Sequence, residues 1–223
     1  MSVAKTSTIF VLTDTRKAYG EMLNKDGEIP FFVNSIEALI SELREVSIAG
    51  LVLEVDKVMK SSRRDRDRLF KYADNFPVMR TRVDSRHGQV TYLDPRDSFF
   101  KNLTEAMGKR QRNFDRIKLS IDCTFSREED PSMVETHSGT ILDISPGGCF
   151  INTTTPIEDE QFINVRIPQL KNSRPIYSSI RWTRPECESA TKCGMGIMFI
   201  DLTEGQAEDI IGLGPTSAQL QEK

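Results

Sequence analysis

Histidine and cysteine, two residue types that often build metal and catalytic centres, are scarce in this sequence. It contains only two histidines, His87 and His137, and its four cysteines form no CxxC pair. The chain therefore has few histidines from which a metal or catalytic centre could be built. The cysteine pattern is typical of reduced thiols in a cytosolic protein. No nucleophile–base pair, paired general-acid carboxylates or phosphate-binding glycine loop is recognisable, so we do not expect an enzyme.

Long apolar runs are also absent. No stretch approaches the roughly 18 apolar residues that a membrane-spanning helix requires, so we expect none. The N-terminal segment MSVAKTSTIFVLTD has a single lysine and a short apolar run. We interpret it as a first strand rather than a cleavable signal peptide.

The formal net charge of −3 is divided unevenly along the chain. Residues 1–108 carry 17 basic and 16 acidic side chains, whereas residues 109–223 carry 13 basic and 17 acidic ones. A net-acidic second half disfavours general DNA or RNA binding, which depends on broad neutralisation of phosphates. Within that half, the segment KRQRNFDRIK (residues 109–118) nevertheless concentrates basic side chains. This local cluster needs an explanation of its own.

Strand and helix patterns alternate in the first half of the chain. Apolar runs predict strands at residues 8–13, 30–33, 49–58, 77–83 and 89–93, and helical patterns cover residues 16–24, 36–46 and 61–76. Such alternation predicts a small α/β domain with a mostly parallel sheet. A connecting helix follows within residues 94–112 and starts near Asp97 or Ser98. It places Phe99, Leu103 and Met107 on one side.

The pattern changes from about residue 113 to short alternating strands separated by turn residues. The strand segments are IKLSIDCTF, TILDIS, CFINTT, FINVRI, IYSSIRW and GMGIMFIDL. Their spacing predicts an antiparallel barrel or a sandwich. We therefore expect an α+β protein of two domains, residues 1–108 and 109–210, followed by a polar tail at residues 211–223.

Two features of the first half invite a functional interpretation. Asp56, together with Glu54, lies at the end of the strand pattern GLVLEVD, as the phosphorylated aspartate does in receiver domains. That resemblance is weak, because only Asp14 follows the first strand and no lysine follows TYL. We expect a receiver-like fold used for protein contacts. The arginine-rich segment SSRRDRDR is interpreted as a solvated helix face with internal ion pairs, and the alternative is a surface for docking or an anionic ligand.

The stretch DISPGGCFI (residues 143–151) places two polar side chains before a tight turn. Asp143 and Ser145 are two apart, so in a strand they face the same side. Pro146 and Gly147 suit the two central positions of a type II turn, whose second residue has a positive φ. Gly148 has no Cβ and permits a close approach of backbone or ligand.

Two arginines upstream complement that stretch. Arg112 and Arg116 are four apart, so one helical turn would align them, whereas in a loop they could close over a ligand from two sides. Arginine forks match phosphate oxygens and the O6/N7 edge of guanine. A carboxylate such as Asp143 accepts hydrogen bonds from guanine N1–H and N2–H₂. The alternative to a ligand-binding site is that Arg112 and Arg116 belong to a salt-bridged helix end and that residues 143–151 form an ordinary hairpin.

The order of these motifs resembles the PilZ domain family over residues 109–205. RxxxR (Arg112, Arg116) precedes DxSxxG (Asp143, Ser145, Gly148), and then come a strand ending in Trp182 and the segment GMGIMFIDL. The resemblance implies a six-stranded antiparallel barrel that binds cyclic di-GMP. It implies that the arginines hold phosphates and guanine edges, and that Asp143 and Ser145 contact a guanine. Many members have an arginine directly before the first motif, which is associated with a stacked ligand dimer. Gln111 stands there in this chain, which leaves one or two ligands open.

We therefore expect a cytoplasmic bacterial receptor for cyclic di-GMP that lacks enzymatic activity. Ligand binding would order the basic arm and change domain or partner contacts, and the first domain would serve as an output or homodimerisation module. The alternatives are an adaptor that acts only through protein–protein interaction and a receptor for cyclic GMP–AMP. The predicted ligand-binding residues are Arg110, Arg112, Arg116, Asp143, Ser145, Gly147 and Gly148.

Overall fold

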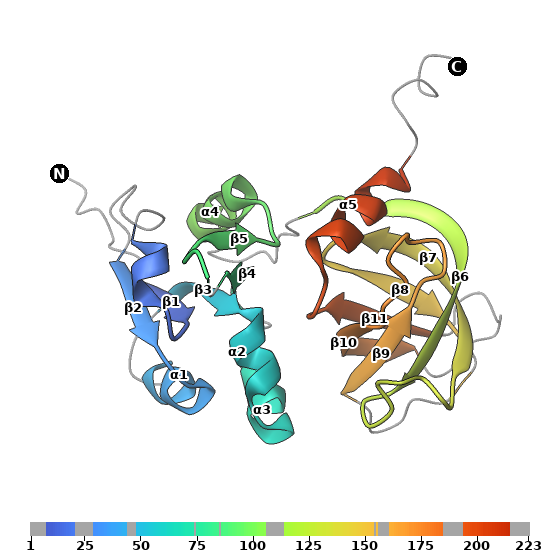
Figure 1. The fold of residues 1–223 in the computed structure, drawn as a ribbon, viewed down its shortest axis with the longest axis horizontal. Coiled ribbons are helices and arrows are strands. Elements are labelled where there is room, and N and C mark those ends of the chain that lie inside the picture. Colours follow the sequence, from blue (N-terminus) through green and yellow to red (C-terminus); the bar gives the residue numbers. More distant parts are fainter. Residues whose placement is uncertain are drawn as a thin grey trace, which may run out of the picture. The chain divides into compact units, whose positions relative to one another are not determined.

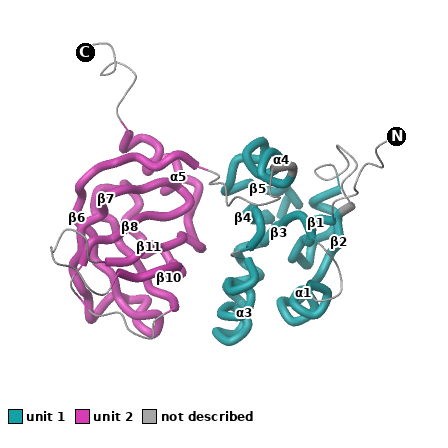
Figure 2. Tube along the Cα trace, turned by 180° about the vertical axis from the view of Figure 1, so that it is seen from behind, with its two compact units in different colours: residues 1–113 teal, residues 114–223 magenta. Residues whose placement is uncertain are grey.

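The computed structural model describes residues 8–20, 29–43, 48–73, 75–84, 86–105, 114–153, 155, 161–184 and 194–214 (Figure 1). Contacts divide the chain into two compact units, residues 1–113 and residues 114–223, which Figure 2 colours separately. Among the described residues, no helix combines the length and apolar character needed to span a bilayer.

The first unit contains a five-stranded sheet with the order β2-β1-β3-β4-β5 (Figure 1). The first four strands pair in parallel and β5 is antiparallel, which confirms the predicted mostly parallel sheet. The strands are β1 (Thr8–Leu12), β2 (Ile29–Val33), β3 (Ile48–Glu54), β4 (Val78–Val83) and β5 (Val90–Tyr92). The helices are η1 (Arg16–Tyr19), α1 (Ile36–Glu42), α2 (Val55–Lys60), α3 (Arg63–Ala73) and α4 (Arg96–Glu105).

Helices on both faces explain why the inner strands are continuous apolar runs. Residues 9–12 of β1 and 51–53 of β3 are all buried, as expected for parallel strands covered on both sides. The connecting helix α4 begins at Arg96 and buries Phe99 and Leu103, as predicted. A Cβ on Gly50 would lie 2.4 Å from Leu103 Cδ2, so α4 packs closely on β3 at this glycine. Met107 lies outside the described residues.

Two predicted elements of the first unit differ in the structure. The strand expected over residues 49–58 ends at Glu54, and α2 begins at Val55. Val55 and Val58 are buried at a helical spacing of three, and the apolar pattern alone had extended the strand through them. Asp56 therefore lies in the first turn of a helix, where it pairs with Arg82 (Nη1 to Oδ1, 2.6 Å).

The other difference concerns residues 16–24, where a longer helix was expected. A short 3-10 helix, η1, occupies residues 16–19, and residues 21–28 lie outside the described part. This turn buries Tyr19, whose hydroxyl lies 2.7 Å from Thr81 Oγ1. Burial raises the pKa of Tyr19 to about 12.

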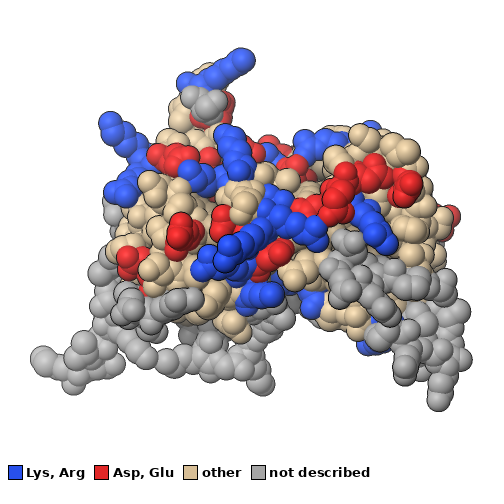
Figure 3. All heavy atoms as spheres, turned by 90° about the horizontal axis from the view of Figure 1, so that it is seen from below, with Lys and Arg blue, Asp and Glu red and all other residues tan. Residues whose placement is uncertain are grey.

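The arginine-rich segment forms the start of α3. Ser62 Oγ accepts a hydrogen bond from the Asp65 amide at 3.2 Å, which caps this helix, and Arg68 lies 3.9 Å from Asp65. Lysine and arginine side chains are interspersed with aspartate and glutamate on the face drawn in Figure 3. Internal pairing of this kind supports the interpretation as a solvated helix face.

The second unit is a closed antiparallel barrel with the strand order β10-β11-β8-β7-β6-β9. The strand pattern left both a barrel and a sandwich open, and the closed sheet identifies the barrel. The strands are β6 (Ile117–Arg127), β7 (His137–Ser145), β8 (Gly148–Asn152), β9 (Phe162–Arg166), β10 (Ile176–Arg184) and β11 (Gly194–Phe199). Helix α5 (Glu204–Gly212) follows and starts with a reciprocal capping box between Thr203 and Gln206.

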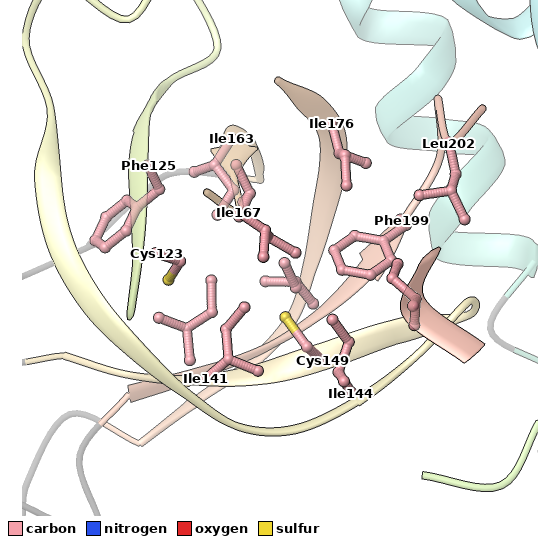
Figure 4. Packing of buried hydrophobic residues seen from close by; sticks show 14 of the residues in the cluster. Cys123, Phe125, Ile141, Ile144, Cys149, Ile163, Ile167, Ile176, Phe199 and Leu202 are labelled. Carbon is pink, nitrogen blue, oxygen red and sulfur yellow. The ribbon is translucent and has the colours of Figure 1, made fainter. Parts of the chain in front are cut away.

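Alternating inward side chains fill the barrel, as the close view in Figure 4 shows. Cys123 and Cys149 lie among them as free thiols. Burial raises the pKa of Cys123 to about 12 and that of Cys149 well above its ordinary value, so both stay protonated at neutral pH. Cys187 and Cys193 lie outside the described residues.

Candidate ligand-binding site

The DxSxxG motif forms the hairpin between β7 and β8. Ser145 and Gly148 are register partners that flank the two-residue turn of Pro146 and Gly147. The positive φ, 150°, belongs to Gly148, and Gly147 lies outside the left-handed region, which corrects the expected type II turn. A Cβ on Gly148 would lie 2.1 Å from the Ile197 carbonyl oxygen, so the close approach of β11 requires glycine at this position.

An irregularity in β7 turns Asp143 outward. Ile141 pairs with Ile151 but Asp143 pairs with the adjacent Phe150, so Leu142 is an extra residue in the strand. Without it, Asp143 would share a face with Ile141, whose side chain lies in the core (Figure 4). The bulge therefore places the carboxylate on the outer surface of the barrel, where its side chain is 31% exposed.

Ser145 lies two residues beyond Asp143 and is nearly inaccessible, with 4% of its surface exposed. The buried Ile144 between them points into the core, so Asp143 and Ser145 lie on one common face, as predicted, and this face is the outer one. The Ser145 hydroxyl donates to the Gly148 carbonyl oxygen at 3.3 Å and so spans the turn.

Arg116 approaches Asp143 from the segment before β6. Its Nη1 donates to Asp143 Oδ1 in an ion pair, which joins the two motifs. The strand register explains this position, because the next residue, Ile117, pairs with Ile144. Residues 114–116 are not helical, so the described part of RxxxR does not support the alternative of one helical turn aligning both arginines.

Two further residues at this site were not predicted from the sequence. A Cβ on Gly147 would lie 3.4 Å from Phe114 Cδ2, so the Phe114 ring rests on the turn. Lys118 is exposed and is the register partner of Asp143. Phe114 could have been noticed as the apolar residue between the two arginines. Lys118 could be placed at the site only once the pairing of β6 with β7 was known.

The other predicted ligand residues, Arg110 and Arg112, lie outside the described residues, as does Gln111. The structure thus brings together Arg116, Asp143, Ser145, Gly147 and Gly148. These residues offer one guanidinium, one carboxylate and a glycine turn on a single patch of the barrel surface. Such a patch can bind a small ligand that carries both acceptor and donor groups.

Comparison with known proteins agrees with the barrel assignment. Residues 110–213 match the family model described as PilZ domain. No curated protein sequence matches the chain significantly.

Several solved structures are similar to part of the chain at low identity. The PilZ domain of CeSA from a cellulose-synthesizing bacterium is 15% identical, with 45% of this chain and 94% of that chain covered and a TM-score of 0.33. PlzA of Borreliella burgdorferi in complex with c-di-GMP is 15% identical, with coverages of 55% and 50% and a TM-score of 0.37. The PilZ domain of Escherichia coli YcgR with c-di-GMP is 14% identical, with coverages of 47% and 88% and a TM-score of 0.32.

Proposed function

Because residues 110–213 of this chain form a PilZ domain, we propose that the protein is a receptor for cyclic di-GMP. The observation that carries the proposal is the pairing of Arg116 with Asp143 on the outer barrel surface. A guanidinium that can hold a phosphate stands beside a carboxylate that can hold the donor edge of a guanine. Both groups occupy the motif positions at which the family is expected to bind its ligand.

Each side chain has a role in this proposal. The Asp143 carboxylate accepts hydrogen bonds from guanine N1–H and N2–H₂, and Arg116 contacts a phosphate or the O6/N7 edge. Gly147 lets the ligand approach the backbone of the turn, and Gly148 lets β11 hold that turn in place. Arg112, with Arg110 nearby in the chain, supplies further positive charge from the arm.

Binding requires an exchange of partners. Arg116 and Asp143 now satisfy one another, so a cyclic dinucleotide has to replace each half of that ion pair. Phe114 rests on Gly147, next to the nearly buried Ser145. Movement of the arm would lift this ring from the turn and open Ser145 to the ligand, whose guanine can donate to the hydroxyl oxygen.

The same movement would carry the signal. The KRQRNFDR segment (residues 109–116) spans the boundary between the two units along the chain, and its clustered positive charges repel one another. A bound dianion neutralises them and pulls the arm onto the barrel, which changes interdomain or partner contacts. Small-angle X-ray scattering of the full chain should differ with and without cyclic di-GMP, and identical profiles would contradict this part of the proposal.

Ligand identity can be tested by calorimetric titration of the full chain with three cyclic dinucleotides. We expect micromolar or tighter affinity for cyclic di-GMP and no measurable binding of cyclic di-AMP, whose adenines lack the N1–H donor that Asp143 requires. Comparable binding of cyclic GMP–AMP would mean that a single guanine suffices. An absence of heat with cyclic di-GMP would contradict the receptor function and favour an adaptor that works through protein–protein interaction.

A further inference from the structure

The first half of β6 has an edge that no other described strand covers. β6 pairs with β7 over most of its length, but β9 pairs only with residues 124–127. On that side of residues 117–123, the described part of the chain places no strand. An unpaired edge presents backbone N–H and C=O groups with which another strand can pair. This half of β6 is therefore open to the addition of a further strand.

The two edges of the sheet in the first unit are better protected. In β2, the pairing with β1 directs the backbone groups of Pro30 and Phe32 towards the free edge. Pro30 has no N–H to donate, and the Phe32 carbonyl oxygen accepts from Arg16 Nη2 at 3.5 Å. At the opposite edge, β5 is only three residues long. Residues 117–123 contain no proline, so the β6 edge lacks this kind of protection.

The apolar side chains beneath the β6 edge are incompletely covered. Leu119 and Ile121 pack against the barrel core yet are only partly buried, whereas Cys123 in the same strand is 2% exposed. Helix α5 reaches the start of the strand, since a Cβ on Gly214 would lie 3.4 Å from Ile117 Cδ1. A strand added to the edge would bring further apolar side chains against Leu119 and Ile121 and so extend the core.

The outward side chains of this half of β6 are self-complementary. Lys118, Ser120 and Asp122 alternate along the strand and are exposed. When two copies of the strand pair antiparallel about Ser120, Lys118 of each copy stands opposite Asp122 of the other. Opposite charges directly across a sheet stabilise the pairing, and like charges weaken it. The same register sets Leu119 of each copy opposite Ile121 of the other.

We propose that the β6 edge is a homodimer interface, in which residues 117–123 of two copies of this chain pair antiparallel across a two-fold axis at Ser120. The two-fold axis makes the contact self-complementary and closed, so association stops at two copies. Lys118 and Asp122 disfavour strands with a different order of charges, which makes the open edge selective. The proposal does not rest on cyclic di-GMP binding, and it places the contact in the barrel rather than in the first unit.

Sedimentation velocity of the full chain without ligand, over a range of concentrations, tests this interface. The wild type should show a monomer–dimer equilibrium. Asp122→Lys places lysine opposite lysine at both contacts, and Lys118→Glu places glutamate opposite aspartate. Each change should raise the Kd of the dimer roughly tenfold or more. An equimolar mixture of the two variants should form a dimer again, because both contacts then join opposite charges.

Glu135→Lys is the matched control, because it makes the same change of charge at an exposed residue in the loop after β6. Its dimer Kd should equal that of the wild type. A wild type that stays monomeric at every concentration would overturn the proposal. An unchanged Kd in Asp122→Lys would also overturn it and would favour a contact through the first unit.

The mixture also tests the register of the two strands. If the two variants are folded by circular dichroism and yet do not associate when mixed, the pairing about Ser120 is wrong. None of these results bears on the receptor function, which calorimetric titration with cyclic di-GMP tests separately.

Discussion

Arg116 and Asp143, which are 27 positions apart in the chain, form an ion pair on the outer face of the barrel. Their side chains are 21% and 31% exposed, and such partly solvated pairs contribute at most about 1 kcal/mol to stability. The position of the pair is therefore more informative than its energy. It joins two sequence motifs at one point on a rigid sheet, and it leaves both charges within reach of a ligand.

The first prediction concerns the stability of the barrel. Arg116→Ala and Asp143→Ala should each lower the free energy of unfolding by less than about 1 kcal/mol, because water can solvate the remaining charge. Urea denaturation of each variant checks this. Arg174→Ala, which breaks the exposed pair between Arg174 and Asp201, is the matched control and should behave alike. A loss of several kcal/mol confined to the first two variants would mean that these residues are structural.

The second prediction concerns the turn. Gly148→Ala should destabilise the barrel by about 2–4 kcal/mol, because its Cβ would meet the Ile197 carbonyl and its φ is unfavourable for alanine. Gly205→Ala is the control, since nothing lies within 4 Å of a Cβ there and alanine favours the helix α5. In thermal denaturation, the midpoint of Gly148→Ala should lie well below that of the wild type, and the midpoint of Gly205→Ala should lie at or above it. Equal midpoints for both variants would refute the close approach of β11.

The third prediction concerns the first unit. Arg80 and Asp94 form a buried pair in which Nη2 lies 2.7 Å from Oδ1 and Nε lies 3.0 Å from Oδ2. Asp94→Ala should cost about 3–5 kcal/mol, because it leaves a guanidinium buried without its carboxylate. Asp14→Ala removes the exposed partner of Lys57 and should cost less than about 1 kcal/mol. Denaturation of the first unit, monitored by circular dichroism, should distinguish Asp94→Ala from Asp14→Ala. Similar losses of unfolding free energy in the two variants would contradict a buried pair of Arg80 and Asp94.

Sequence patterns predicted the number and type of strands in the barrel but not the directions in which the candidate ligand-binding side chains point. The i, i+2 spacing of Asp143 and Ser145 was visible in the sequence, yet their outward orientation depends on the extra residue Leu142. That residue becomes apparent only from the pairing of β7 with β8. The register of β10 shifts in the same way between Ile180 and Trp182. Bulges follow from the partner strand, so a single strand does not reveal them.

The role of Gly148 and the start of α2 could not be predicted for a related reason, because both depend on packing against distant parts of the chain. Pro146 and Gly147 matched a type II turn, but the close contact of β11 moved the positive φ to Gly148. The boundary between β3 and α2 falls inside an apolar run, where Val55 fits either element until the helix buries Val58. Long-range packing decides such positions and local propensity does not.

The fourth prediction concerns alkaline pH. Burial raises the pKa of Tyr19 from 10 to about 12, so the folded first unit keeps this phenol protonated while the unfolded chain releases the proton. The contribution of the protonated Tyr19 phenol to the free energy of unfolding is fully present below pH 10 and is lost as the pH rises towards 12. Unfolding free energies at several pH values should therefore decline over this window. Tyr19→Phe should flatten the decline, and an unchanged slope would contradict the assignment to Tyr19.

The receptor account can be tested by comparing calorimetric titrations of cyclic di-GMP into the wild type, Arg116→Ala, Asp143→Ala and Arg174→Ala. The account predicts binding by the wild type and by Arg174→Ala with equal affinity. It also predicts a loss of roughly tenfold or more in the other two variants, since each removes a charge-assisted contact to the ligand. Undiminished affinity in Asp143→Ala, with the protein folded, would contradict the account and place the ligand elsewhere.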